Sequence, residues 1–108
     1  MSNKVQKDSK VKVVADTPGK TKYILRLFVT GILPNSVRAI KNINTICNKY
    51  LKGRYELEII DIYQQPSLAI TEELIAVPVL IKKFPLPEEK MLGDLSDTQE
   101  VLKGLSIV

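Results

Sequence analysis

Few side chains of this chain are suited to chemistry, because 108 residues contain one cysteine and no histidine. Histidine is the commonest general base, and zinc, haem and iron–sulfur sites usually take several His or Cys ligands. A metal or cofactor site within one chain is therefore not expected, and an internal disulfide is excluded. Cys47 falls among the apolar positions of a predicted helix, where we expect a buried structural thiol rather than a reactive one.

Two other features invite a chemical interpretation. Asp61, Asp94 and Asp97 are the candidates for a carboxylate pair or a Mg²⁺ site. Asp94 and Asp97 stand where a helix is predicted to begin, so turn and capping roles are expected for them. The Gly31–Pro34 segment also precedes a predicted helix, whose N–H groups can bind an anion. A single glycine with no following Gly-Lys pair does not indicate a phosphate loop, and we expect a strand-to-helix turn.

The basic character of the chain is concentrated at its start. Five lysines and two aspartates give residues 1–20 a formal charge of +3, and the remaining residues carry +1. This segment is polar and ends in the turn signal Thr17-Pro18-Gly19, which predicts a flexible basic extension before a domain at 21–108. A solvated end is expected rather than a nucleic-acid or lipid contact. No apolar run approaches the roughly 20 residues of a membrane span, and no signal-peptide core is present, so the cytoplasm is expected.

The first half of the domain predicts a strand, a helix and a strand. Residues 22–30 carry β-branched and aromatic side chains on both faces, as an interior strand does. Pro34 suits a first helical turn and Gly53 a helix end. The apolar helical positions between them are Val37, Ile40, Ile43, Cys47, Tyr50 and Leu51. Residues 54–63 predict the second strand, and this order favours a right-handed unit with parallel strands.

The second half permits more than one assignment. A short helix is expected near 67–75 and a strand at 76–81, with Pro78 at its start or edge. Residues 91–93 suit a brief strand or a loop. Residues 96–99, Ser-Asp-Thr-Gln, have capping-box form and predict a helix through Lys103 that Gly104 ends. Residues 105–108 suit a strand equally well.

Several motifs follow one another in order from about residue 22 to residue 108. They read Tyr-Ile-Leu-Arg-Leu-Phe-Val-Thr-Gly (23–31), Pro-Asn-Ser-Val-Arg-Ala (34–39), Gly-Arg-Tyr-Glu-Leu-Glu-Ile-Ile-Asp-Ile (53–62), Pro-Ser-Leu-Ala (66–69), Ala-Val-Pro-Val-Leu (76–80), Gly-Asp-Leu-Ser-Asp (93–97) and Val-Leu-Lys-Gly-Leu (101–105). Together they resemble the KaiB family of bacterial clock proteins. Residues 1–20 lie outside the resemblance.

The resemblance implies a thioredoxin-related single α/β domain with a regulatory, non-enzymatic role. It implies a metamorphic second half, in which helices and strands exchange while the first strand–helix–strand unit stays unchanged. The ground form would be a dimer or tetramer, and the switched, thioredoxin-like monomer would bind a KaiC-type ATPase. A KaiA-like protein or a histidine kinase is a further implied partner. Nucleic acid, membranes and cofactors are not implied.

The resemblance also implies site residues. Arg38 and Lys41 on the predicted helix, with Glu56 and Glu58 on the second strand, are the candidates for partner binding. The candidate fold-switch positions are Pro78, Gly104 and Ser106. In a thioredoxin-like domain, the proline that opens this strand is commonly cis. Thioredoxins use a Cys-x-x-Cys motif in the first strand-to-helix turn, and residues 30–35 of this chain contain no cysteine.

Departures from the family pattern keep a second hypothesis open. Ser106 stands where clock-type members commonly have Asp, and residues 88–90 read Glu-Glu-Lys where a basic pair is usual. Glu56 and Glu58 occupy positions where a small residue and a lysine help to dock partners, and two acidic residues there would repel a patch that suits a lysine. The alternative is therefore a KaiB-like oligomer outside a clock, in stress adaptation or other signalling. An enzymatic alternative, redox chemistry by Cys47, is the least favoured.

Overall fold

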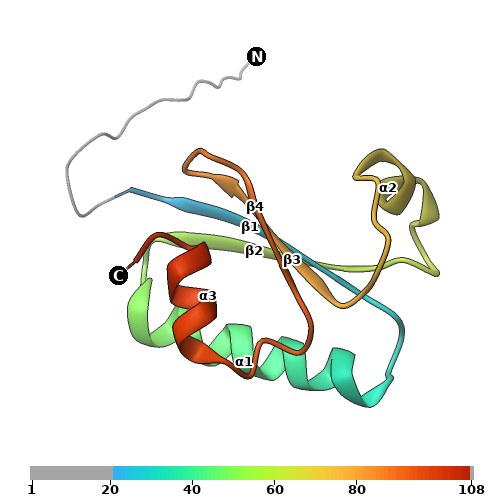
Figure 1. Cartoon of the computed structure of the whole chain (residues 1–108), viewed down its shortest axis with the longest axis horizontal. Helices are drawn as coiled ribbons and strands as arrows, with labels where there is room; N and C mark the ends of the chain where they lie inside the picture. Colours follow the sequence, from blue (N-terminus) through green and yellow to red (C-terminus); the bar gives the residue numbers. More distant parts are fainter. Residues whose placement is uncertain (1–20, 108) are drawn as a thin grey trace.

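A computed structural model describes residues 21–107 as one four-stranded sheet with helices on both faces (Figure 1). The strand order is β2-β1-β3-β4. The strands are β1 (Tyr23–Val29), β2 (Tyr55–Asp61), β3 (Val79–Phe84) and β4 (Glu89–Leu92), and the helices are α1 (Pro34–Tyr50), α2 (Pro66–Thr71) and α3 (Thr98–Gly104). The extension predicted over residues 1–20 lies outside the described residues, and so does Val108.

The first half confirms the predicted strand–helix–strand unit. β1 and β2 are parallel, with Tyr23 opposite Tyr55. Pro34 occupies the first turn of α1, where its missing N–H removes no helical hydrogen bond. The helix ends at Tyr50, three residues before Gly53, whose φ of 77° belongs to the turn that leads into β2.

The main hydrophobic core lies between the sheet and helices α1 and α3, on what we call the α1/α3 face. Alternate residues of β1 point into it, and α1 covers them with Ala39, Ile43, Ile46 and Cys47. Val37, expected on the inward face, is instead half exposed, and Ser36 is buried in its place. Each large apolar side chain that is buried in this way stabilises the fold by about 1.5–3 kcal/mol.

A smaller cluster covers part of the opposite side of the sheet, the α2 face. Phe28, Ile60, Val79 and Ile81 are buried there, and Leu68 of the short helix α2 packs against them. α2 has only 6 residues and none of them is buried. Much of the α2 face toward the start of β1 therefore carries polar side chains instead of a helix.

The elements of the second half exist as expected, with shifted bounds. α2 ends at Thr71, before the expected position 75, and β3 begins at Val79, directly after Pro78. The Val77–Pro78 peptide bond is cis. The short strand expected near 91–93 is β4, which ends at Leu92 and pairs antiparallel with β3.

The start and end of α3 correct two predictions. The N-cap is Asp97, not Ser96, because the Asp97 side chain accepts a hydrogen bond from the Glu100 N–H at 3.2 Å. Gly104 does not end the helix through a left-handed conformation. That conformation belongs to Ser106, with a φ of 63°, while Gly104 is the last helical residue. The strand alternative for residues 105–107 is wrong, because α3 and a turn occupy this end of the chain.

Candidate partner-binding surface

The turn between β1 and α1, where thioredoxins place their cysteines, is closed by hydroxyl groups in this protein. The Thr30 N–H donates to Ser36 Oγ at 3.1 Å. Cys47 lies apart from this turn, in the core, where burial raises the pKa of its thiol to about 12. A thiol with such a pKa stays protonated at neutral pH and is a poor nucleophile.

The three aspartates singled out from the sequence serve the backbone. Asp94 Oδ1 accepts a hydrogen bond from the Ser96 N–H at 3.1 Å, and Asp97 caps α3, so the expected turn and capping roles are confirmed. Asp61 Oδ1 accepts from the Tyr63 N–H at 2.8 Å. Within residues 21–107, no three Cys, Asp or Glu side chains are grouped so that they would hold a metal ion.

Glu56 and Glu58 lie on the α2 face of β2, and each is paired with a basic residue of its own chain. Glu56 lies 2.7 Å from Lys22 Nζ, and Glu58 lies 3.3 Å from Arg26 Nε. The two carboxylate side chains are 62% and 56% exposed, so these pairs add little to stability but neutralise the surface locally. The acidic face expected from the sequence is therefore a face of paired charges.

These pairs continue across the sheet as a charged belt, which we define as Arg26, Glu58, Glu72, Lys83 and Glu88. Glu72, at the end of α2, lies 3.7 Å from Arg26 and 3.0 Å from Lys83 Nζ, and its side chain is only 12% exposed. Lys83 Nζ also lies 2.8 Å from Glu88. Hydrogen bonds to Glu88 and Glu72 raise the pKa of Lys83, and the same ammonium lowers the pKa of Glu88. The belt joins β2, β1 and β3 to the end of α2.

Arg38 and Lys41 lie on α1, on the other side of the sheet from Glu56 and Glu58. Arg38 Nε donates to Asp94 Oδ2 at 3.0 Å, and this guanidinium lowers the pKa of the Asp94 carboxyl. Lys41 is exposed. The four candidate partner-binding residues therefore form two separate pairs and not one patch, and Arg38 also ties α1 to the loop between β4 and α3.

The three candidate switch positions all lie at the β3–β4 hairpin or contact it. The Pro78 carbonyl accepts the Gly93 N–H at 3.0 Å, which joins the two ends of the β3–β4 hairpin. A Cβ atom added to Gly104 would lie 2.5 Å from Met91 Sδ and 2.8 Å from Met91 Cγ, so α3 can approach β4 closely only because position 104 has no side chain.

Ser106 contacts a residue that the sequence reasoning missed. Its Oγ lies 3.3 Å from Nζ of Lys82, a side chain with an exposure of 0% that points from β3 into the α1/α3 face. The signal for Lys82 was present in the sequence, because Lys82 and Lys83 are adjacent in a strand, and adjacent strand residues point to opposite faces. One of the two had to enter the core side of the sheet.

Comparison with known proteins assigns the family. The KaiB domain model matches residues 26–107. The circadian clock oscillator protein KaiB of a Cyanothece species is 44% identical over 92 residues, which cover 85% of this chain and 88% of the relative. The protein of the same name from Synechococcus elongatus is 45% identical over 92 residues, 85% of this chain and 89% of the relative. The chain belongs to the KaiB family.

Solved structures confirm the thioredoxin-like fold of this KaiB-family chain. The N-terminal domain of Synechococcus elongatus SasA superposes with a TM-score of 0.67 at 23% identity, covering 92% of this chain and 94% of that domain. Mitochondrial thioredoxin 3 from Saccharomyces cerevisiae gives 0.66 at 13% identity, covering 82% and 81%. At these identities the likeness concerns the fold alone.

Proposed function

We propose that this chain is a non-enzymatic regulatory module that binds a KaiC-type ATPase in the thioredoxin-like topology. The observation that carries the proposal is the match of residues 26–107 to the KaiB domain, together with relatives that are named circadian clock oscillator proteins. The topology of residues 21–107 is the one that the family resemblance assigns to the partner-binding monomer. The SasA domain and the thioredoxins share this fold.

The geometry supports binding over chemistry. The β1–α1 turn presents hydroxyl and apolar side chains, and Cys47 is enclosed in the core with a raised pKa. Redox turnover would need an exposed thiol in an electropositive setting, whereas Cys47 is buried among apolar side chains. The proposal therefore relies on the exposed side chains Arg38, Lys41, Glu56 and Glu58 as parts of contact surfaces.

We further propose that the second half exchanges topology, with Pro78, Gly104 and Ser106 as the positions that bias the exchange. Pro78 joins the two ends of the β3–β4 hairpin, and Gly104 and Ser106 contact its strands, so each of them bears on the hairpin that distinguishes this topology. The other topology would be the oligomeric ground form, a dimer or tetramer. Because only the competent fraction binds, a small fraction would weaken the apparent affinity in proportion.

A second candidate function is a KaiB-like regulator outside a clock. The paired charges of Glu56 and Glu58 favour it, because this face presents neutralised ion pairs where the family resemblance implies a lysine that helps to dock partners. A partner that recognises that lysine would find no free cation at these positions. Its role would be in stress adaptation or other signalling, with partners other than those of a clock.

The direct test is binding of the full chain to the KaiC-type ATPase of its host, with nucleotide present, by surface binding kinetics and light scattering. We expect slow association and a complex of larger mass than the free chain. Glu56→Gln with Glu58→Gln should raise the affinity by freeing Lys22 and by leaving Arg26 with Glu72 as its one remaining carboxylate among the described residues. Lys41→Gln is a matched control on the opposite side of the sheet. Absence of binding by the wild type and by all variants would refute the clock role and leave the second candidate.

A further inference from the structure

The outer edge of β4 has backbone groups with no partner among the described residues. β4 ends the sheet, and within residues 21–107 it pairs only with β3. The Gly93 N–H donates to the Pro78 carbonyl, and alternate residues of an antiparallel strand direct their backbone groups to the same side. Glu89 and Met91 therefore face β3, while the N–H and C=O groups of Lys90 and Leu92 point outward. An edge of this kind can pair with an added strand.

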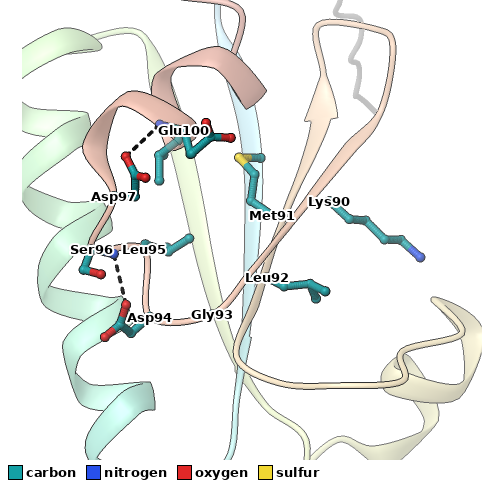
Figure 2. Close-up of a pocket in the computed structure, with 10 residues that line it drawn as sticks. Lys90, Met91, Leu92, Gly93, Asp94, Leu95, Ser96, Asp97 and Glu100 are labelled. Carbon is teal, nitrogen blue, oxygen red and sulfur yellow. Dashed lines mark hydrogen bonds between the residues drawn. The ribbon is translucent and has the colours of Figure 1, made fainter.

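A pocket of about 460 Å³ lies beside this edge, between β4 and α3 (Figure 2). Figure 2 shows Met91 and Leu95 pointing toward the space between strand and helix, whereas Lys90 and Leu92 point away from it. Leu92 is 63% exposed on that other side. An added strand would therefore meet a pocket on one face and an exposed apolar side chain on the other.

The pocket is acidic within a basic chain. Its lining contains Asp94, Asp97 and Glu100 against one lysine, Lys90, whose Nζ is bound to the Glu72 carbonyl at 2.9 Å. Arg38 already pairs with Asp94 at 3.0 Å, so Asp97 and Glu100 are the two lining carboxylates left to attract a basic partner. The one ion pair of Glu100, to Lys103 at 3.6 Å, joins side chains that are both about two thirds exposed and holds the carboxylate weakly.

We propose that the outer edge of β4 binds an extended segment of a partner protein in which basic and apolar residues alternate. Its backbone would pair with Lys90 and Leu92, its basic side chains would cross Met91 to reach Glu100 and Asp97, and its apolar side chains would cover Leu92. The surface contains none of the candidate partner-binding or switch residues, although its Asp94 pairs with Arg38 and its Met91 lies against Gly104, and the inference does not depend on a KaiC-type partner.

Two other arrangements fit the charges less well. A second copy of β4 would bring Asp97 and Glu100 of the two pockets together, and like charges oppose such pairing. The opposite edge of the sheet, β2, has Glu56 and Glu58, but both are ion-paired, to Lys22 and Arg26, whereas Asp97 of the pocket has no ion pair among the described residues. A basic segment therefore gains most at β4.

Amide hydrogen exchange of the full chain, followed by NMR, tests this with the acetylated peptide amide Lys-Val-Lys-Val-Lys as the probe. Protection of Met91 in the free chain shows that the β3–β4 hairpin is formed; where the free chain lacks this protection, saturating peptide should induce it, because the peptide binds only the form that has the hairpin. Saturating peptide should slow exchange at Lys90 and Leu92 at least about tenfold, as expected for newly made strand hydrogen bonds. The matched peptide Glu-Val-Glu-Val-Glu should have no effect. No protection at millimolar probe, or protection at β2 instead, would overturn the proposal.

Variants of the edge separate backbone pairing from charge. Lys90→Pro removes an N–H that points outward from the sheet, and an edge strand tolerates proline at such a position. This variant should bind the peptide about tenfold more weakly. Lys90→Ala loses the same side chain, keeps the N–H and should bind within about twofold of wild type. Glu100→Gln should weaken binding about threefold and flatten its salt dependence. If Lys90→Pro does not fold, the wild-type exchange map decides; equal affinity of all three variants and wild type would contradict strand addition.

Discussion

At the scale of single residues, Cys47 illustrates how burial decides reactivity. Its thiol is fully enclosed, and burial raises its pKa to about 12, so the reactive thiolate is scarce at pH 8. Alkylation by iodoacetamide should be negligible in the native protein and rapid in guanidinium. Fast native alkylation would show that Cys47 is accessible and would reopen the redox hypothesis.

Because Cys47 is buried, the stability of a variant at this position should depend on the polarity of the new side chain. Cys47→Ala should fold with a modest loss, while Cys47→Ser should cost about 1–2 kcal/mol more, because it adds a hydroxyl in an apolar core. Urea unfolding compares the two variants. A serine variant as stable as the alanine variant would indicate that water or a polar group reaches this site.

Ser106 offers a second prediction at this scale. Lys82 is a buried ammonium whose side-chain partner among the described residues is the Ser106 hydroxyl, at 3.3 Å. Ser106→Asp should stabilise this topology by about 1–2 kcal/mol through a charge-assisted hydrogen bond, and Ser106→Arg should destabilise it by placing two cations together. Urea unfolding followed at the β3–β4 hairpin measures both effects. In a Lys82→Met background both should disappear, and their persistence would refute the contact.

At the scale of elements, α3 and β4 are held close by the absence of a side chain at Gly104. Gly104→Ala would push its methyl group against Met91, at a cost of about 1–3 kcal/mol that improved helix propensity offsets in part. We expect a net loss of about 1 kcal/mol in the free energy of unfolding. In a Met91→Ala background the same change should be neutral or stabilising, and a double-mutant cycle in denaturant that shows no coupling would contradict this packing.

The Arg38–Asp94 ion pair, which joins α1 to the β4–α3 loop, predicts that the stability of the fold depends on pH. Arg38 lowers the pKa of Asp94 in the folded state, so between that pKa and the ordinary value near 4 the unfolded chain takes up the proton first. The contribution of Asp94 to stability is thus present above about pH 4 and is lost as the pH falls through the lowered pKa. The free energy of unfolding, measured in urea from pH 7 to pH 3, should fall less steeply for Asp94→Asn than for wild type. Parallel curves would argue against the pair.

At the scale of the whole molecule, the first half followed from the sequence because each of its elements has one consistent pattern. β1 carries apolar residues on both faces, and α1 has a proline at its start and an apolar stripe along 17 residues. The second half was harder because its elements have only 4 to 7 residues and are built by tertiary contacts. Ser106 and Gly104 make their contacts with Lys82 and Met91, which no local pattern connects to them.

The candidate surface was predictable in its residues but not in its pairing. The spacing placed Glu56 and Glu58 correctly on one face of a strand, but only the register of β1 against β2 brings Lys22 and Arg26 beside them. The sequence likewise placed Arg38 and Lys41 on the exposed side of a helix. That they lie on the opposite side of the sheet from the two glutamates follows from the packing of α1 alone.

The central claim is that the thioredoxin-like topology is the form that binds the partner, and its most direct test is hydrogen exchange on the complex. The full chain would be measured free and bound to the KaiC-type ATPase of its host with nucleotide present. We predict that the bound chain shows strand protection at Val79–Phe84 and Glu89–Leu92 and helical protection at Thr98–Gly104, as in the structure. A bound chain in which residues 98–107 are protected as a strand, with the β3–β4 pairing lost, would contradict the account.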